Sequence, residues 1–175
     1  MKETKKAIIG RNALVDFGDE VLGVPAKVDT GADSSAVWAS DIFVDKEHLL
    51  HFKLFAKGSR FYTGVEHVAD NYSVALTRSS SGDMMLKFRT KILVKIDGHE
   101  MLTTFGLSDR STHMYPILIG RKTLHGHFVV DVENEYEVEL ENGRTTPKHL
   151  NAKMRENPYK FYKEYYLSYS DDEEE

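Results

Sequence analysis

Three consecutive residues, Asp29, Thr30 and Gly31, follow an apolar stretch that ends at Val28. A plain core strand would end there in a turn, whereas this one is followed by a carboxylate, a hydroxyl and a glycine. Carboxylate oxygens accept backbone N–H hydrogen bonds, a threonine hydroxyl bonds to a neighbouring loop, and glycine adapts to tight backbone geometry. The combination indicates a carboxylate positioned in a cleft for acid–base chemistry.

One carboxylate of this kind does not make an enzyme. Amide hydrolysis by aspartates uses two carboxylates about 3 Å apart that share one proton, so that one activates water and the other protonates the carbonyl. The chain contains Asp-Thr-Gly once. The second Asp29 must therefore come from another copy of the chain, which predicts a two-fold symmetric homodimer.

The plain alternative for this tripeptide is a turn at the end of a strand. In such a turn the Asp29 side chain caps the backbone and Gly31 takes a positive φ. Trp38, a few residues further on, is expected in the core rather than in a substrate pocket.

The elements that must position these residues are mostly short strands. Between residues 13 and 140, apolar stretches alternate with turn signals, and Asp97-Gly98 gives a two-residue hairpin turn. The last expected strand covers residues 127–143. Short helices are expected over about residues 122–126 and between Pro147 and Pro158. The sequence therefore predicts a mostly β protein, a closed β-barrel with one or two short helices.

Two motifs resemble those of the retropepsins, the retroviral type of aspartic peptidase. Residues 28–33 (VDTGAD) resemble the active-site loop, and residues 115–124 (YPILIGRKTL) resemble the segment that precedes the single helix of that fold. The resemblance implies a retropepsin-like (acid protease) barrel with Asp29, Thr30 and Gly31 as the catalytic loop. It also implies that Arg121 forms a buried bidentate pair with Asp33 as structural support, whereas Arg121 is otherwise an exposed residue at a helix start.

A closer resemblance is to a bacterial and archaeal family labelled ATP-dependent zinc proteases, whose members are retropepsin-like. Residues 78–89 (RSSSGDMMLKFR) and 108–131 are similar to two runs of that family. Members occur beside ATP-grasp ligases that add glutamates to a ribosomal protein. The resemblance implies processing of peptides or glutamyl tails, with such a ligase as a partner.

The polar run at residues 79–82 has two interpretations. Ser79, Ser80, Ser81 and Gly82 form either an ordinary exposed hairpin tip or a flap that closes over a bound substrate.

Nothing in the sequence supports the zinc or the ATP of that family label. The chain has no cysteine, and its eight histidines include no His-Glu-x-x-His spacing; His125 and His127 form the one His-x-His pair. Gly120-Arg121-Lys122-Thr123 lacks the upstream glycine of a phosphate-binding loop. We therefore expect no cofactor and no metal.

Length and charge limit the organisation and the partners. With 175 residues, the chain is expected to form one barrel domain over residues 1–150 and a Tyr-rich acidic tail over 151–175, either solvated or used for docking. The net charge of −5 equals that of the final DDEEE, and no basic stripe is visible, which argues against nucleic acid. Without a long apolar run or signal peptide, we expect no membrane partner and a cytoplasmic location.

These observations predict a retropepsin-like aspartic peptidase that works as a homodimer. It would hydrolyse peptide or glutamyl-type amide bonds with water activated by the shared Asp29 dyad. The alternative is a non-catalytic peptide-binding module in which the same cleft grips a peptide for an ATP-grasp ligase without cutting it.

Overall fold

The computed structural model describes residues 6–78, 84–140 and 148–164, and the chain forms two compact units, Met1–Asn142 and Gly143–Glu175. The described part of the first unit contains one helix, α1 (Arg121–Leu124), and the strands β1 (Ala7–Ile9), β2 (Asn12–Phe17), β3 (Val21–Asp29), β4 (Ser35–Val44), β5 (Leu50–Leu54), β6 (Glu66–Ala69), β7 (Tyr72–Arg78), β8 (Met84–Ile96), β9 (His99–Ser108), β10 (Ile117–Gly120) and β11 (Phe128–Val130). The expected flap residues, Ser79, Ser80, Ser81 and Gly82, lie outside the described residues.

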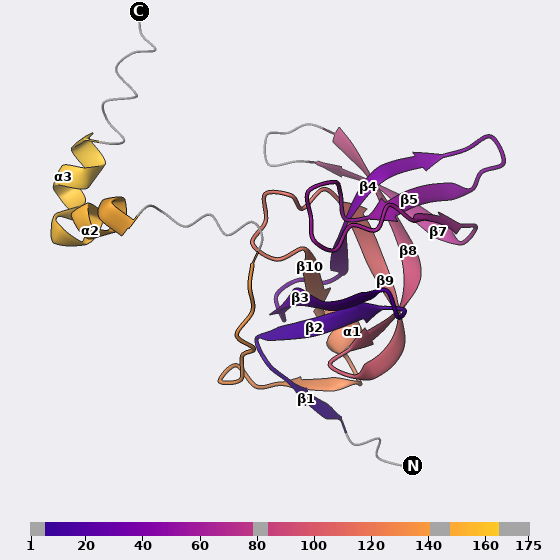
Figure 1. Ribbon diagram of the computed structural model, residues 1–175, viewed down its shortest axis with the longest axis horizontal. Helices are drawn as coiled ribbons and strands as arrows, with labels where there is room; N and C mark the ends of the chain where they lie inside the picture. The colour runs from indigo at the N-terminus through magenta and orange to yellow at the C-terminus, as the bar shows by residue number, and fades with distance from the viewer. Residues whose placement is uncertain (1–5, 79–83, 141–147, 165–175) are drawn as a thin grey trace, which may run out of the picture. The chain divides into compact units, whose positions relative to one another are not determined.

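Six strands of the first unit close into a barrel in the order β10-β3-β2-β8-β9-β4 (Figure 1). Closure depends on β10, because it pairs in parallel with β3 on one side and antiparallel with β4 on the other. β1 and β11 form a separate parallel pair. The predicted fold class, a mostly β closed barrel with few short helices, is confirmed.

Alternation along the strands fills the barrel with apolar side chains. In β2 the buried side chains include Ala13 and Val15, and in β10 they include Ile117 and Ile119. Trp38 is 5% exposed and packs edge-to-face on Phe55, which confirms its expected place in the core.

The hairpin expected at Asp97-Gly98 is confirmed. β8 and β9 pair without a register shift from Arg89 opposite Gly106 to Ile96 opposite His99. Both turn residues have positive φ, 45° for Asp97 and 80° for Gly98, as a tight turn that matches the strand twist requires. The Asp97 carboxylate also accepts the backbone N–H of Leu14 at 2.8 Å, which ties the turn to β2.

The last expected strand is mostly wrong. Of residues 127–140, only Phe128–Val130 form a strand, and residues 131–140 have no strand partner in the described part of the chain; residues 141–143 lie outside it. Instead, the fully buried Asn12 side chain donates to the Tyr136 carbonyl at 2.9 Å and accepts from the Tyr136 N–H at 2.7 Å. Arg60 pairs with Glu139, and Arg11 pairs with Glu135. Two backbone hydrogen bonds, from the Arg11 N–H to the Asn134 oxygen and from the Asp131 N–H to the Ile9 oxygen, add to these contacts, so separate contacts rather than a continuous ladder fasten this segment.

The second unit contains α2 (Lys148–Glu156) and α3 (Pro158–Tyr162). The helix expected between Pro147 and Pro158 is confirmed as α2, and Pro158 then begins α3 at its first turn, where Asn157 caps the N–H of Lys160. The tail expected from residue 151 thus includes much of α2 and all of α3. Among the helices that the structure describes, none combines the length and the apolar composition needed to cross a bilayer.

Beyond the barrel, β4 continues into a sheet with β5 and β6, where His51 lies between two carboxylates. His51 Nε2 is 2.9 Å from Asp45 Oδ2, and Nδ1 is 3.2 Å from Glu66 Oε2, an ion-pair contact without good hydrogen-bond geometry. The Phe43 ring stacks on the imidazole at 4.7 Å. Asp45 first and Glu66 second raise the pKa of His51 above its ordinary value, because both stabilise the imidazolium.

The barrel strand β10 contacts the candidate catalytic loop, residues 30–34, at Gly120. A Cβ at this position would lie 2.6 Å from the carbonyl carbon and oxygen of Ser34 and 3.0 Å from the Ala32 oxygen. Because backbone atoms cannot move aside as a flexible side chain can, only glycine lets β10 pass this close to residues 32–34.

We expect Gly120→Ala to lower the free energy of unfolding by about 3 kcal/mol, the upper end for over-packing, because the added methyl meets backbone. Denaturant unfolding followed by circular dichroism measures this. Gly106→Ala is the matched control in the barrel wall, since its Cβ would meet the end of the Lys87 side chain at 3.4 Å. Equal destabilisation by the two substitutions would contradict the argument.

We expect the His51 contacts to stabilise the fold at low pH and to lose that effect as the pH rises. Because the pKa is higher in the folded state than in the unfolded state, the contribution is complete below the unfolded pKa and disappears through the folded pKa. Unfolding free energies of the parent and of His51→Gln, measured between about pH 5.5 and 9, should differ most at the acid end. A difference that grows with pH would contradict this sign.

Candidate active site

The candidate catalytic loop, Thr30 to Ser34, joins two strands that do not pair with each other at this point. Its entry strand β3 and its exit strand β4 both pair with β10, so β10 lies between them. Gly120 stands opposite Asp29 in this arrangement. The loop then continues to contact the chain after β10, because the Arg121 N–H donates to the Ala32 oxygen at 2.8 Å.

Asp29 ends β3 with its carboxylate oriented by the loop itself. Oδ1 accepts the backbone N–H groups of Gly31 at 3.0 Å and Ala32 at 3.2 Å. Oδ2 lies 3.8 Å from the Lys27 ammonium, and 32% of the Asp29 side chain is exposed. One oxygen is therefore fixed by the backbone, while the carboxylate as a whole stays within reach of solvent or a partner.

Gly31 and Thr30 differ in what they do. A Cβ on Gly31 would lie 3.3 Å from Asp29 Oδ1, so glycine leaves room for the carboxylate. Its φ is not in the positive region, so that part of the plain turn interpretation is wrong, whereas the expected capping by Asp29 is present. Thr30 is exposed, and its hydroxyl has no hydrogen-bond partner among the residues that the structure describes.

Arg121 pairs with Asp33, as the resemblance implied, but the pair is neither buried nor bidentate. Arg121 Nε and Nη2 both approach Asp33 Oδ1, at 3.2 and 3.1 Å, and the side chains are 62% and 52% exposed. Lys122, which the sequence analysis missed, takes the other oxygen at 2.6 Å. The two cations, Lys122 before Arg121, lower the pKa of Asp33 and keep it ionised. The pair is exposed because α1 begins at the barrel surface in the single chain.

A contact between the hydroxyls of the buried Ser35 and the partly buried Thr123 braces the loop, which sequence reasoning also missed. Ser35 is 2% exposed; its Oγ accepts the Gly120 N–H at 3.0 Å and lies 2.7 Å from Thr123 Oγ1. Thr123 is the second residue after Arg121, so the same short segment supplies three of the groups that support the loop.

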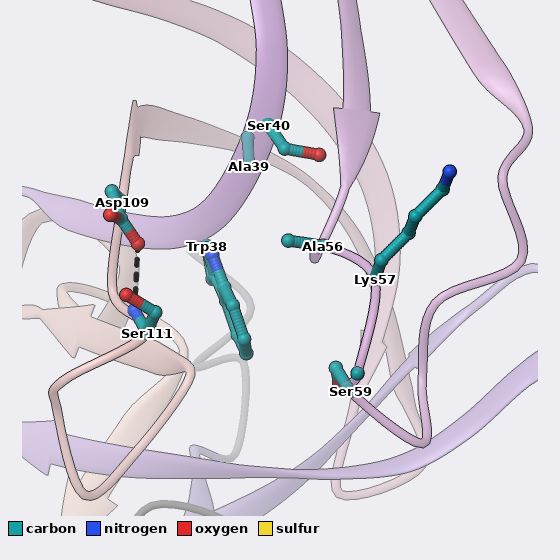
Figure 2. Close-up of a pocket in the computed structure, with 9 residues that line it drawn as sticks. Trp38, Ala39, Ser40, Ala56, Lys57, Ser59, Asp109 and Ser111 are labelled. Atoms are coloured by element: carbon teal, nitrogen blue, oxygen red, sulfur yellow. Dashed lines mark hydrogen bonds between the residues drawn. The ribbon is translucent and has the colours of Figure 1, made fainter.

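A cavity of about 500 Å³ lies beside Trp38 (Figure 2). In Figure 2 the Asp109 carboxylate and Ser111 point toward each other on one side of Trp38, and Lys57 and Ser59 lie on the other. Asp109 accepts the Ser111 N–H at 2.8 Å, which lowers its pKa, so this carboxylate is a poor proton donor. Asp29, Thr30 and Gly31 are not among the residues that line the cavity.

A second cavity, of about 540 Å³, borders the other end of the loop, between β9 and α1. Its lining includes Ser34, Arg89, Thr104 and Lys122. The wall is therefore mixed: it carries the cations Arg89 and Lys122, the carboxylate of Glu100 and the apolar side chains of Met101 and Leu102, next to the residues that follow Asp29-Thr30-Gly31.

Metal ligands do not gather in the described part of the chain. No group of three or more His, Asp or Glu side chains there is arranged to hold an ion. His125 and His127 are both exposed.

Comparisons with known proteins bear on the fold of the chain. No family model and no curated protein sequence matches the chain. Among solved structures, the chain is similar to Lpg0085, a protein of unknown function (DUF785) from Legionella pneumophila subsp. pneumophila str. Philadelphia 1, with a TM-score of 0.56 and 21% identity over 77% of this chain and 100% of the other. At this identity the likeness supports the fold alone.

We expect Ser35→Ala to lower the free energy of unfolding by about 1–3 kcal/mol, because it leaves the buried Gly120 N–H without an acceptor. Denaturant unfolding measures the change. Ser34→Ala, at the neighbouring and more exposed position, is the matched control and should change little. A loss from Ser34→Ala as large as that from Ser35→Ala would contradict the role of the buried bond.

Proposed function

We propose that the chain is a retropepsin-like aspartic peptidase that hydrolyses peptide or glutamyl-type amide bonds as a homodimer. The observation that carries the proposal is the state of Asp29. Its carboxylate stands at the end of a barrel strand, oriented by two backbone N–H groups and partly exposed, in a tripeptide that occurs once in the chain. Such a group is ready to meet its copy across a two-fold axis.

The chemistry follows from placing two such carboxylates together. At about 3 Å they cannot both ionise, so the pair holds one proton between them. The ionised member takes a proton from water, the water oxygen attacks the amide carbon, and the protonated member donates to the carbonyl oxygen. Proton transfer to the nitrogen then releases the amine. Neither a covalent enzyme intermediate nor a metal takes part in this scheme.

The other predicted residues support this dyad rather than react. Gly31 leaves room for Asp29 Oδ1, and the exposed Thr30 hydroxyl is available to bond to the loop of the second copy. Asp33 remains ionised, and its ion pairs with Arg121 and Lys122 fasten the loop to the start of α1. The resemblance to a family found beside ATP-grasp ligases favours a glutamate-rich peptide as substrate and such a ligase as partner.

We expect Asp29→Asn to abolish hydrolysis of acidic peptides and leave the fold intact, because asparagine keeps the size and the acceptor oxygen but cannot take a proton from water. Cleavage is followed by mass spectrometry between about pH 4 and 7 with a chelator present, and a bell-shaped profile is expected for the parent. Asp109→Asn, a carboxylate in the other cavity, is the matched control and should retain activity.

Mixing tests the dimer directly. If one active dyad needs two parental Asp29 residues, equal amounts of parent and Asp29→Asn subunits, allowed to exchange, should leave about one quarter of the dimers active. Activity that stays at one half would show that each chain acts alone. A parent that binds acidic peptides and never cuts them would instead identify the peptide-binding module.

A further inference from the structure

The strand β8 carries four cationic side chains on one face, Lys87, Arg89, Lys91 and Lys95, and the exposed Leu93 takes the position between the last two. We call these four residues the basic stripe. No basic stripe was expected from the sequence; the four cations are separated along the chain by uncharged residues, whereas a strand places every second residue on one face. The signal was the spacing in KFRTKILVK, residues 87–95.

The pairing places all four side chains on the same face. β8 pairs with β7 through Lys87 opposite Ala75, and with β9 through Arg89 opposite Gly106, and neither ladder has a register shift. The Lys87 side chain confirms the direction, because its Cε lies 3.4 Å from the position of a Cβ on Gly106. Alternate residues in a strand are about 6.6 Å apart, so the stripe is about 26 Å long.

The stripe has few anions of its own. Within the parts of the chain that the structure describes, none of its four cations forms an ion pair. Glu100 and Asp16 stand opposite Lys95 on the two neighbouring strands, at one end only. At the other end, Ser73, Ala75 and Gly106 are the residues opposite Arg89 and Lys87, so the positive charge there has no acidic residue across the ladder.

The stripe also leads to the cavity between β9 and α1. Arg89 lines this cavity of about 540 Å³ together with Thr104, Ser34 and Lys122. Lys91 and Lys95 are exposed, whereas Lys87 and Arg89 are partly buried. An anionic chain lying on the stripe would therefore reach a hollow next to the loop that follows Asp29, with Arg89 and Lys122 as cations in its wall and Glu100 as its carboxylate.

We propose that the basic stripe binds an acidic peptide in extended conformation, as a surface separate from the Asp29 tripeptide. An extended peptide presents alternate side chains on one side at the same spacing of about 6.6–6.8 Å. Carboxylates at every second position therefore meet Lys87, Arg89 and Lys91 in turn, and after the position opposite Leu93 the next carboxylate meets Lys95. The proposal does not depend on hydrolysis.

Two other anionic partners fit the face less well. Single-stranded nucleic acid is held by aromatic side chains on which bases stack, and the residues that the ladders place on this face in the described strands include no aromatic one. An anionic membrane would need a larger apolar surface than the exposed pair Leu93 and Leu102 provides.

The test is binding of a fluorescein-labelled decapeptide of alternating Glu and Ser, measured by fluorescence anisotropy at about 50 mM salt. The variant Lys87→Gln/Lys91→Gln/Lys95→Gln should bind at least about tenfold more weakly. Lys6→Gln/Lys46→Gln/Lys57→Gln removes the same charge from scattered exposed lysines and should bind within about twofold of the parent. Lys91→Gln/Lys95→Gln, which changes two exposed residues, gives a weaker effect of the same sign and guards against misfolding.

Three results would overturn the proposal. Equal losses of peptide affinity in the two triple variants would show that binding depends on the net charge of the protein and not on the basic stripe. Tighter binding of an oligothymidylate or of phosphatidylserine vesicles than of the peptide would assign the face to nucleic acid or to a membrane. Equal affinity for a decapeptide of the same composition with its five glutamates in one block would remove the spacing argument. Repeating the titration with Asp29→Asn excludes loss of the probe by cleavage, so this result and that of the hydrolysis test are independent.

Discussion

The insertion of β10 between β3 and β4 is the constraint on which both the barrel and the candidate site depend. It closes the ladder, since β10 pairs with both neighbours, and it brings the backbone of residues 117–120 under the loop that carries Asp29. Gly120 permits the contact because it has no side chain, and the Ser35 hydroxyl satisfies its buried N–H. Without the Ser35 hydroxyl, the buried N–H of Gly120 would have no acceptor, at a cost comparable to a lost hydrogen bond. The same contact therefore stabilises the fold and orients the loop.

Asp29 and Asp33 are only four residues apart, yet their carboxylates have different electrostatic environments. Asp33 is paired with Arg121 and Lys122, which fixes it as an anion with a lowered pKa and makes it unsuited to proton transfer. Asp29 receives hydrogen bonds from uncharged backbone N–H groups on one oxygen, and its nearest cation, Lys27, is 3.8 Å away. Asp33 is therefore held in ion pairs, whereas Asp29 keeps a carboxylate oxygen without a hydrogen bond in the described part of the chain. Acid–base catalysis by carboxylates uses such a difference in environment.

Much of the fold could be predicted from local pattern, because strand alternation and turn chemistry act over a few residues. The Asp97-Gly98 hairpin and the helix that ends before Pro158 are examples. The site was predicted only as a tripeptide and one ion pair. The Ser35–Thr123 brace and the Lys122 contact join residues almost ninety positions apart, and such contacts have no short-range signal. The strand predicted over residues 131–140 was wrong for the opposite reason. The alternation of these residues suits a strand, but their partners are the side chains of Asn12 and two arginines and not a neighbouring strand. The basic stripe was not expected, although β8 was predicted as a strand, because its four cations are separated along the chain by uncharged residues.

The late position of β10 in the sequence has a consequence for how the chain folds during synthesis. β3 and β4 are made early, yet the strand that pairs with both is made only after β9, and the partner of β1 is made later still. Until residue 120 has left the ribosome, the facing edges of β3 and β4 have unpaired N–H and C=O groups, the kind of edge that promotes aggregation. Closure by such distant contacts is also slow, because a long loop must be ordered before any pairing is gained. The Asp29 loop consequently acquires its geometry at the end of barrel formation, when Gly120 reaches it.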